Sequence, residues 1–377
     1  MDFELWYLIL VPLLFAAGWF ARSFDIKEKQ TIADEKDTLY KGVDLLLSNK
    51  QDQAIDAFIN LVKLDPDTVE MHFSLAGLFR RRGEFDRAIK IHNVLVNRED
   101  LPKKIRSRAL YELGEDYLKA GLWDRAEESF LKLSDTSESY KTIARKELLH
   151  IYETEKEWQK AIDEANIIQR QSGEDQSTRI AQLYCELTQQ NLYFKNFKGA
   201  AEALEKALKV DPNNKRALII KGKMLKAKGD IDGALATWKQ VGQISPAYGT
   251  LVVDQIASLL LEAGRKEEAV QYLEDLFKDG STTDEVDTAG ILLGKAGNSK
   301  EAIALIQEHL KTHPTLVAFY RLIDLRLANE PENESLKQLH GLLKNMLSKA
   351  VRYKCTKCGF ATRKFLWRCP GCHQWET

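Results

Sequence analysis

The chain has 377 residues, of which 29% are charged and 44% hydrophobic, so it is long enough for two or three ordinary domains or one elongated array. Its 55 Lys and Arg residues balance 56 Asp and Glu residues, so the net charge is close to zero. This excludes attraction of nucleic acid or of an anionic membrane by the overall charge of the chain. With only 8 prolines and 21 glycines, the composition suits helices and disfavours a β-sandwich or barrel. We therefore expect an all-α protein.

Near the start of the chain, residues 5–21 contain no charged or strongly polar side chain over 17 positions, the short end of what a transmembrane helix requires. Asp2 and Glu4 stand where a cleaved signal peptide would carry basic residues, and a buried core helix is disfavoured because the segment is apolar on all faces. Basic residues follow the apolar run and none precedes it. The pattern predicts a single-pass anchor over residues 1–22 with the rest of the chain in the cytoplasm.

After a linker at residues 23–34, an alanine recurs at a nearly constant interval. It occupies positions Ala54, Ala88, Ala126, Ala161, Ala200, Ala234, Ala269 and Ala302, with gaps of 34, 38, 35, 39, 34, 35 and 33 residues. This period is typical of the tetratricopeptide repeat, whose two antiparallel helices need a small residue where they cross. The sequence therefore predicts a superhelical solenoid of about eight such repeats over residues 35–328.

Prolines and glycines recur in step with these alanines. Four prolines fall twelve residues after an alanine, where they would end the second helix: Pro66, Pro212, Pro246 and Pro314. Five glycines fall five residues before one, in the expected turn between the helices: Gly83, Gly121, Gly229, Gly264 and Gly297. Aromatic residues at helical spacing are expected to form the core between stacked helices.

The first helix of each repeat should line the inner groove of the superhelix, which predicts a binding function. By repeat phase, the candidate partner-binding residues are Arg80, Arg81, Tyr111, Lys119, Lys223 and Lys226. The run Arg80 to Arg82 could bind a partner's carboxylates or could be a solvated helix end favoured by the dipole. Cys185 is expected to fill space inside the fifth repeat.

A linker and an amphipathic helix are expected over residues 329–349, followed by a small module at 350–377. This module contains two Cys-x-x-Cys pairs separated by ten residues: Cys355, Cys358, Cys369 and Cys372. Two such pairs build a tetrahedral four-sulfur site that holds one structural metal ion. Zinc is favoured for that purpose and iron stays open, whereas thioredoxin-type redox chemistry lacks its strand and helix context.

Basic and aromatic residues are dense in the terminal module, where Glu376 is the only acidic residue. Binding of single-stranded nucleic acid, through Arg363, Lys364 and Arg368, and binding of anionic lipid are therefore alternatives. His373 is expected to be a neighbour of the cysteine pairs rather than a ligand. No common catalytic constellation occurs in the chain, so an enzyme is not expected.

The combination of anchor, repeats and four-cysteine module resembles the lipopolysaccharide assembly protein B family. Specific segments contribute to the resemblance, namely 78–84, 86–89, 184–187, 353–360 and 367–372. The terminal module also resembles rubredoxin, but its two cysteine pairs are closer together and His373 stands where glycine is common. We therefore do not infer an electron-transfer function from this resemblance.

The family resemblance implies an inner-membrane adaptor that helps a membrane ATP-dependent metalloprotease degrade the deacetylase of the committed step to lipid A. Other implied partners are envelope assembly proteins and inner-membrane lipids. A membrane-tethered scaffold for envelope enzymes, without a role in proteolysis, is the alternative. The sequence leaves open whether two copies form a homodimer.

Overall fold

The computed structural model describes residues 69–277 and 282–377, together with the isolated residues Arg22, Tyr40, Asp44, Leu45 and Gln53. Residues 1–21 of the expected anchor lie outside this part of the chain, as does the first repeat alanine, Ala54. Among the described helices, none combines the length and the apolar character needed to cross a bilayer.

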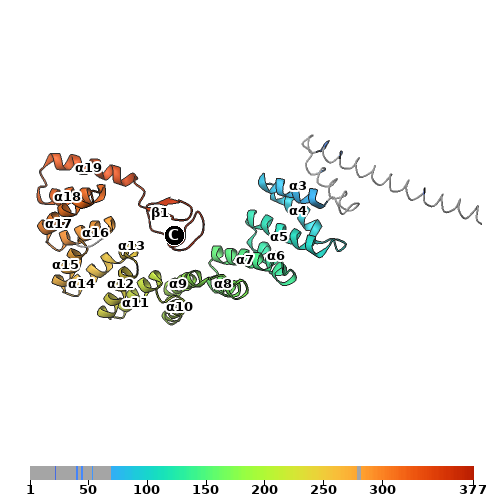
Figure 1. Cartoon of the computed structure of the whole chain (residues 1–377), viewed down its shortest axis with the longest axis horizontal. Coiled ribbons are helices and arrows are strands. Elements are labelled where there is room, and N and C mark those ends of the chain that lie inside the picture. The colour runs from blue at the N-terminus through green and yellow to red at the C-terminus, as the bar shows by residue number, and fades with distance from the viewer. Residues whose placement is uncertain (1–21, 23–39, 41–43, 46–52, 54–68, 278–281) are drawn as a thin grey trace, which may run out of the picture. The chain divides into compact units, whose positions relative to one another are not determined.

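The chain divides into two compact units, Met1–Glu157 and Trp158–Thr377, which we call unit 1 and unit 2. The described part of unit 1 consists of helices that pack on their neighbours in chain order (Figure 1). These are α3 (Val69–Arg81), α4 (Phe85–Val96), α5 (Lys103–Lys119), α6 (Trp123–Thr136) and α7 (Lys141–Glu155).

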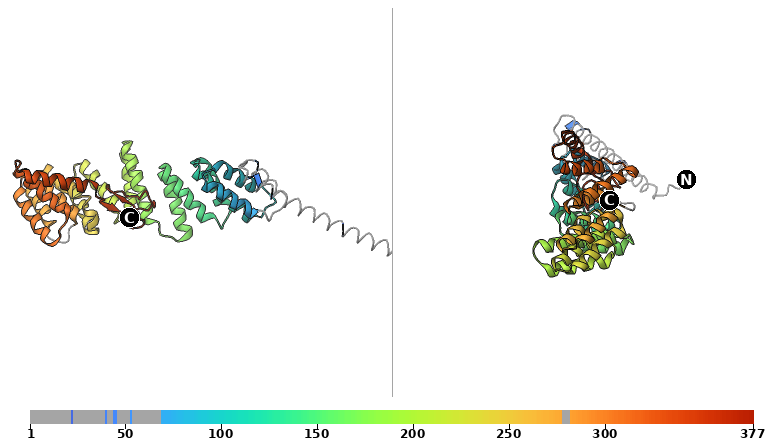
Figure 2. Two further views of the ribbon diagram at one scale, coloured as in Figure 1. Left: turned by 90° about the horizontal axis from the view of Figure 1, so that it is seen from above. Right: turned by 90° about the vertical axis from the view of Figure 1, so that its left-hand side faces the viewer.

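Unit 2 continues the same pattern of antiparallel helical hairpins, stacked side by side (Figure 2). Its helices are α8 (Trp158–Ser172), α9 (Ser177–Tyr193), α10 (Phe197–Val210), α11 (Lys215–Ala227), α12 (Ile231–Ile244), α13 (Pro246–Gly249), α14 (Val253–Glu262), α15 (Lys266–Asp275), α16 (Thr283–Lys295), α17 (Ser299–Thr312), α18 (Leu316–Asn329) and α19 (Glu334–Lys349). Two short strands follow, β1 (Tyr353–Lys354) and β2 (Ala361–Thr362).

Small residues allow the two helices of each hairpin to approach closely. Every repeat alanine that the structure describes, from Ala88 to Ala302, is fully buried. Glycine has the same use on the first helix: a Cβ added to Gly222 would lie 2.2 Å from Trp238 Nε1. One added to Gly114 would lie 2.6 Å from Phe130 Cζ. These contacts explain the period of the sequence and confirm the expected tetratricopeptide-repeat solenoid.

The turns inside the hairpins require a left-handed residue five positions before the repeat alanine. All five glycines predicted for this position have positive φ, between 74° and 88°. At two further described positions in this phase, lysine takes the same conformation, Lys156 with φ 62° and Lys195 with φ 58°. Lys195 lies between α9 and α10, which pack against each other, so the packing of this hairpin imposes the turn geometry even on a residue that disfavours it.

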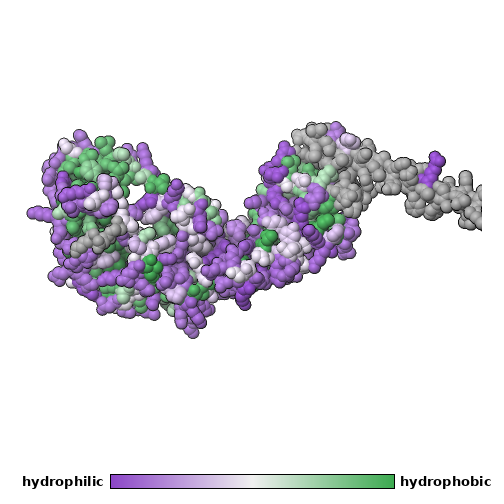
Figure 3. All heavy atoms as spheres, in the orientation of Figure 1, coloured by the Kyte–Doolittle hydropathy of each residue, from purple (hydrophilic) through white to green (hydrophobic). Residues whose placement is uncertain are grey.

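One feature was not evident from the repeat spacing. Pro246 follows α12 as expected, but it also begins the short helix α13, which lies between two hairpins. The terminal helix α19 is capped by the Asn333 side chain and packs against α18. Figure 3 shows apolar side chains gathered over α18 and α19, where Leu316, Leu342 and Met346 are exposed.

We predict that Lys156→Gly stabilises the protein by about 0.5–1 kcal/mol, because glycine relieves the left-handed strain of a residue with a Cβ. The reciprocal change in the preceding hairpin, Gly121→Lys, should destabilise it by a similar amount. Urea denaturation followed by circular dichroism measures both. Equal stabilities of the two variants would contradict the assignment of strain to this turn.

Candidate metal centre and its seat on the repeats

The terminal module consists of two loops with the same hydrogen-bond pattern. Strand β1 pairs antiparallel with β2 around the first loop, and a bridge between Arg368 and Trp375 closes the second. In the first loop the N–H of Cys355 donates to Phe360 O (2.8 Å), and the N–H of Gly359 donates to Cys355 O (3.0 Å).

The second loop repeats both bonds fourteen residues later. The N–H of Cys369 donates to Gln374 O, and the N–H of His373 donates to Cys369 O, each at 2.9 Å. Gly359 and His373 therefore occupy equivalent positions, and both have positive φ, 76° and 58°. The histidine that departs from the rubredoxin pattern thus adopts the conformation that glycine favours.

The two loops bring all four cysteine sulfurs together, within 4.8 Å of one another. The Cys355 and Cys372 sulfurs are 3.7 Å apart, and those of Cys358 and Cys369 are 3.6 Å apart. Four thiolates at the usual zinc–sulfur distance of about 2.3 Å form a tetrahedron with edges of roughly 3.8 Å. The cluster therefore fits one metal ion, and its four soft sulfur donors suit zinc or iron.

Hydrogen bonds distinguish the sulfurs from one another. The contact with Thr377 Oγ1 (3.2 Å), and then the Cys358 backbone N–H, lower the pKa of Cys355 to about 5. For Cys358 the backbone bond with Phe360 lowers the pKa, but burial and the neighbouring thiols outweigh it and raise the value to about 12. Thiolates this close repel one another, so full ionisation of the set requires a cation among them.

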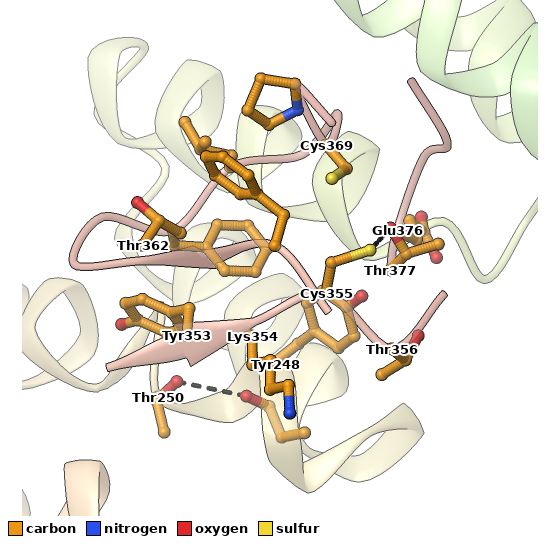
Figure 4. Close-up of a pocket in the computed structure, with 15 residues that line it drawn as sticks. Tyr248, Thr250, Tyr353, Lys354, Cys355, Thr356, Thr362, Cys369, Glu376 and Thr377 are labelled. Carbon is orange, nitrogen blue, oxygen red and sulfur yellow. Dashed lines mark hydrogen bonds between the residues drawn. The ribbon is translucent and has the colours of Figure 1, made fainter. Parts of the chain in front are cut away.

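A cavity of about 290 Å³ lies beside Cys355, between the terminal module and α13 (Figure 4). Tyr248 of α13 and Tyr353 of β1 form part of its wall, and the labelled side chains of Cys355 and Thr377 face each other at its edge. The module is therefore seated against the repeats of unit 2.

We call the contact between the terminal module and the repeats the seat. It is centred on Arg216 of α11, which is only 4% exposed. Its guanidinium lies over two rings of the terminal module, 5.7 Å from the centre of Trp367 and 5.9 Å from that of Trp375. Within the repeats it pairs with Glu186 of α9 at 2.9 Å. A buried cation between two indole rings gains cation–π attraction where water does not compete.

Glu376 connects the module to the same two helices. Gln182 Nε2 of α9 donates to its carboxylate at 2.7 Å, and Lys215 Nζ of α11 lies 3.1 Å away. Gln182 also accepts from Arg216 through its side-chain oxygen (3.3 Å), so one amide joins both charged groups. The only acidic residue of the terminal module is thus the one that meets the repeats.

Aromatic stacking and a second ion pair extend the seat. Tyr248 stacks on Trp367 with the ring centres 5.7 Å apart and meets Phe365 edge-on at 5.8 Å. Arg352 pairs with Asp284 of α16 at 2.9 Å. The aromatic residues of the module therefore include a docking surface for its own repeats.

The predicted partner-binding residues are not gathered into one site. In unit 1, Arg80 Nε donates to Asp116 at 2.6 Å and a second guanidinium nitrogen pairs with Glu112, so this arginine already holds acidic groups of its own chain. Asp116 is buried and also contacts His92 Nδ1 at 2.6 Å. Arg81 is exposed on α3.

The surroundings of Tyr111 are acidic. Burial first, and then the charges of Glu115 and Glu147, raise the pKa of Tyr111 to about 12. Lys119 is exposed nearby and lowers the pKa of both glutamates, which burial raises overall.

In unit 2, Lys223 and Lys226 lie on α11, and Lys226 pairs with Glu262 at 2.7 Å. The residues that contact the terminal module, Lys215 and Arg216, lie two turns earlier on the same helix and escaped sequence reasoning. A sequence signal existed in Glu376, the lone carboxylate of a basic module, but its partners depend on the tertiary fold.

Comparison with known proteins agrees with this geometry. Residues 353–377 match the family model described as rubredoxin metal binding domain, and residues 41–100 and 192–246 match that of the tetratricopeptide repeat. Lipopolysaccharide assembly protein B of Escherichia coli K12 is 35% identical over 98% of this chain and 96% of its own length. The Haemophilus influenzae protein of the same name is 29% identical over the same shares of the two chains.

Two solved structures with similarity to part of this chain are named as repeat proteins. A tetratricopeptide repeat protein from Parabacteroides merdae matches 74% of this chain and 100% of its own with 16% identity and a TM-score of 0.33. The C-terminal part of a repeat protein from Cytophaga hutchinsonii matches 71% and 98% with 14% identity and a TM-score of 0.36.

Fold and site together define a tetratricopeptide-repeat protein with a rubredoxin-like metal-binding terminus. By its identity to the Escherichia coli protein over almost the whole length, the chain belongs to the lipopolysaccharide assembly protein B family.

We predict that Glu376→Gln loosens the module from the repeats by about 1.5–3 kcal/mol, the usual contribution of hydrogen bonds to a charged group. Hydrogen exchange of the backbone amides in β1 and β2 should become faster. The matched control is Glu334→Gln, which removes an exposed pair with Lys337 worth about 0–1 kcal/mol. Exchange as slow as in the unmodified chain would show that Glu376 does not hold the module.

Proposed function

We propose that this chain is a membrane-anchored adaptor in lipopolysaccharide assembly, which promotes degradation of the lipid A committed-step deacetylase by a membrane ATP-dependent metalloprotease. The observation that carries the proposal is the seat of the terminal module on α9 and α11, by Arg216 and Glu376. Because these are first helices of their hairpins, repeats and module present one composite surface. Such a surface suits the recognition of protein partners.

The names of the curated relatives support the role in lipopolysaccharide assembly, since they match 98% of this chain. An adaptor acts by positioning, and no group on the composite surface needs to make or break a bond. Its groove residues, Arg80, Arg81, Tyr111, Lys119, Lys223 and Lys226, are the proposed contacts for partners. Of these, Arg81, Lys119 and Lys223 are exposed side chains on first helices.

The four cysteines would hold a structural metal ion, with zinc favoured over iron. Four thiolate ligands leave no open position for substrate, so the ion would supply folding energy rather than catalysis. Its role would be to keep the two loops closed, and thereby to present Trp367, Trp375 and Glu376 to the repeats. Loss of the ion would then release the seat as well as the loops.

Residues 1–22 would tether the protein to the inner membrane, with units 1 and 2 in the cytoplasm. A tether raises the effective concentration of the adaptor around membrane-bound partners, often to the millimolar range for short linkers. Weak contacts with protease and deacetylase are then sufficient for function.

The purified full chain is predicted to contain one zinc ion, measured by plasma mass spectrometry. Cys369→Ser should lower zinc affinity by more than about 100-fold, because even residues that only support metal ligands contribute 10–100-fold. Cys185→Ser is the control, since Cys185 is buried among α9 to α11 and should leave the zinc content unchanged. Full zinc retention by Cys369→Ser would contradict the ligand assignment.

In cells that lack this protein, the deacetylase half-life is predicted to lengthen, measured by pulse-chase labelling. The full chain should restore the short half-life, whereas a chain without residues 2–21 and the Glu376→Gln variant should restore it only partly. Glu334→Gln serves as the control that behaves like the unmodified chain. An unchanged half-life in cells lacking the protein would instead favour the scaffold alternative.

A further inference from the structure

The turn between α9 and α10 exposes three large aromatic side chains to solvent. Tyr193 is 82% exposed, Phe194 70% and Phe197 65%. We call residues 193–198 the aromatic turn; it joins the helices labelled α9 and α10 in Figure 1. An apolar group of this size on a protein surface usually marks a site of interaction.

The backbone of the aromatic turn is held in place by hydrogen bonds. Asn196 accepts from the N–H of Gly199 at 3.1 Å, and its amide nitrogen donates to Asn191 at 2.9 Å. The N–H of Asn196 in turn donates to Asn191 O at 2.8 Å. The rings are thus presented outward by an ordered turn, which lowers the entropic cost of using them for binding.

The charge around these rings is positive. Lys195 and Lys198 alternate with the aromatic residues, and no carboxylate occurs in the sequence between Glu186 and Glu202. The rings and lysines together would match a surface that is both apolar and negatively charged.

A groove continues the apolar surface away from the turn. Phe197, Ala201, Leu204 and Leu208 follow one another along a single face of α10, and the last three line a cavity of about 500 Å³ between α10 and α11. The lysines on its rim are Lys209, Lys221 and Lys228, and Glu205 is the only acidic residue of its lining. The aromatic turn therefore lies at one end of a cationic groove, at the floor of which Leu204 is buried.

We propose that the aromatic turn and this groove dock onto the surface of an anionic lipid bilayer. Tyrosine and phenylalanine rings are suited to the headgroup region, and lysines are attracted to anionic lipids. A bilayer offers apolar depth and negative charge in one plane, whereas a protein partner would need a separate pocket for each ring. The contact rests on the proposed function, because the tether at residues 1–22 would keep unit 2 near the bilayer and a second contact would orient it.

The test uses the full chain reconstituted in nanodiscs of phosphatidylcholine, with or without phosphatidylglycerol. The exposed residue Gln190, one helical turn before Phe194, is changed to cysteine and labelled with an environment-sensitive nitrobenzoxadiazole dye. The unsubstituted chain, labelled in parallel, corrects for reaction at native cysteines. The dye emission should increase and shift to the blue in anionic discs, and the change should weaken as salt is added.

The double variant Phe194→Ser, Phe197→Ser should lose most of this change. Lys195→Gln should lower the ratio of protein with a docked turn to protein with an undocked turn about fivefold. This is the effect expected of one basic residue at an anionic surface. The matched control is Leu316→Ser, which removes an exposed apolar side chain of α18 and should leave the dye signal unaltered.

The outcomes separate this contact from the tether. A chain that enters the discs while its dye emits identically in both lipids would overturn the docking proposal and leave the tether intact. A chain that fails to enter the discs would refute the tether. The labelled chain would then be mixed with preformed anionic discs, and the emission of its dye would still decide whether the turn docks. A signal that depends on protein concentration and not on lipid would assign the surface to self-association and overturn the proposal.

Discussion

The position of the terminal module depends on one buried cation. Arg216 comes from the repeats, yet its guanidinium lies over Trp367 and Trp375 of the module, and its charge is compensated by Glu186. The module adds two cation–π contacts, each worth about 0.5–2 kcal/mol depending on how far the cation is desolvated, so these contacts favour the seated module over displaced ones. The cysteine loops and the repeats are therefore coupled energetically, although Tyr353 lies 137 positions after Arg216 in the chain.

Because of this coupling, closure of the metal site would affect the contact with the repeats as well as the two cysteine loops. The candidate ligands Cys369 and Cys372 belong to the second loop, which is flanked by Trp367 and Trp375, so an ion that closes the loop would also fix the positions of the two indole rings. Glu376 follows directly and reaches Lys215 and Gln182. A closed four-sulfur site would consequently stabilise the shape of the module, as the proposed adaptor function requires of a surface preorganised for partners.

The repeats show how strongly tertiary packing dominates local preference. Lysine adopts the left-handed conformation at positions 156 and 195, and at position 195 it does so because α9 and α10 pack against each other and the chain must turn back there. His373 does the same in the metal-binding loop, opposite Gly359 in the other loop. In each case the surrounding hydrogen bonds and buried contacts outweigh a local cost of about 1–2 kcal/mol.

Much of this architecture could be predicted from the sequence, because its signals are local and periodic. The recurrence of alanine, the glycines of the turns and the spacing of the four cysteines each follow from a contact between residues close in the chain. The helix pairs and the sulfur cluster were therefore foreseeable. The short helix α13 was not, since Pro246 equally ends a helix or begins one.

The contacts between distant segments were decided only by the tertiary structure. Arg80, a candidate for binding a partner's carboxylates or for a solvated helix end, is held by Glu112 and Asp116 of the next hairpin, and nothing in its own helix indicates this. Likewise, no spacing pairs Arg216 with Trp367 and Trp375, or Glu376 with Lys215. Sequence by itself determined the repeats and the ligand set, because periodicity records short-range packing. The tertiary structure decided which charges are engaged, because charge pairing across the solenoid depends on how the repeats stack.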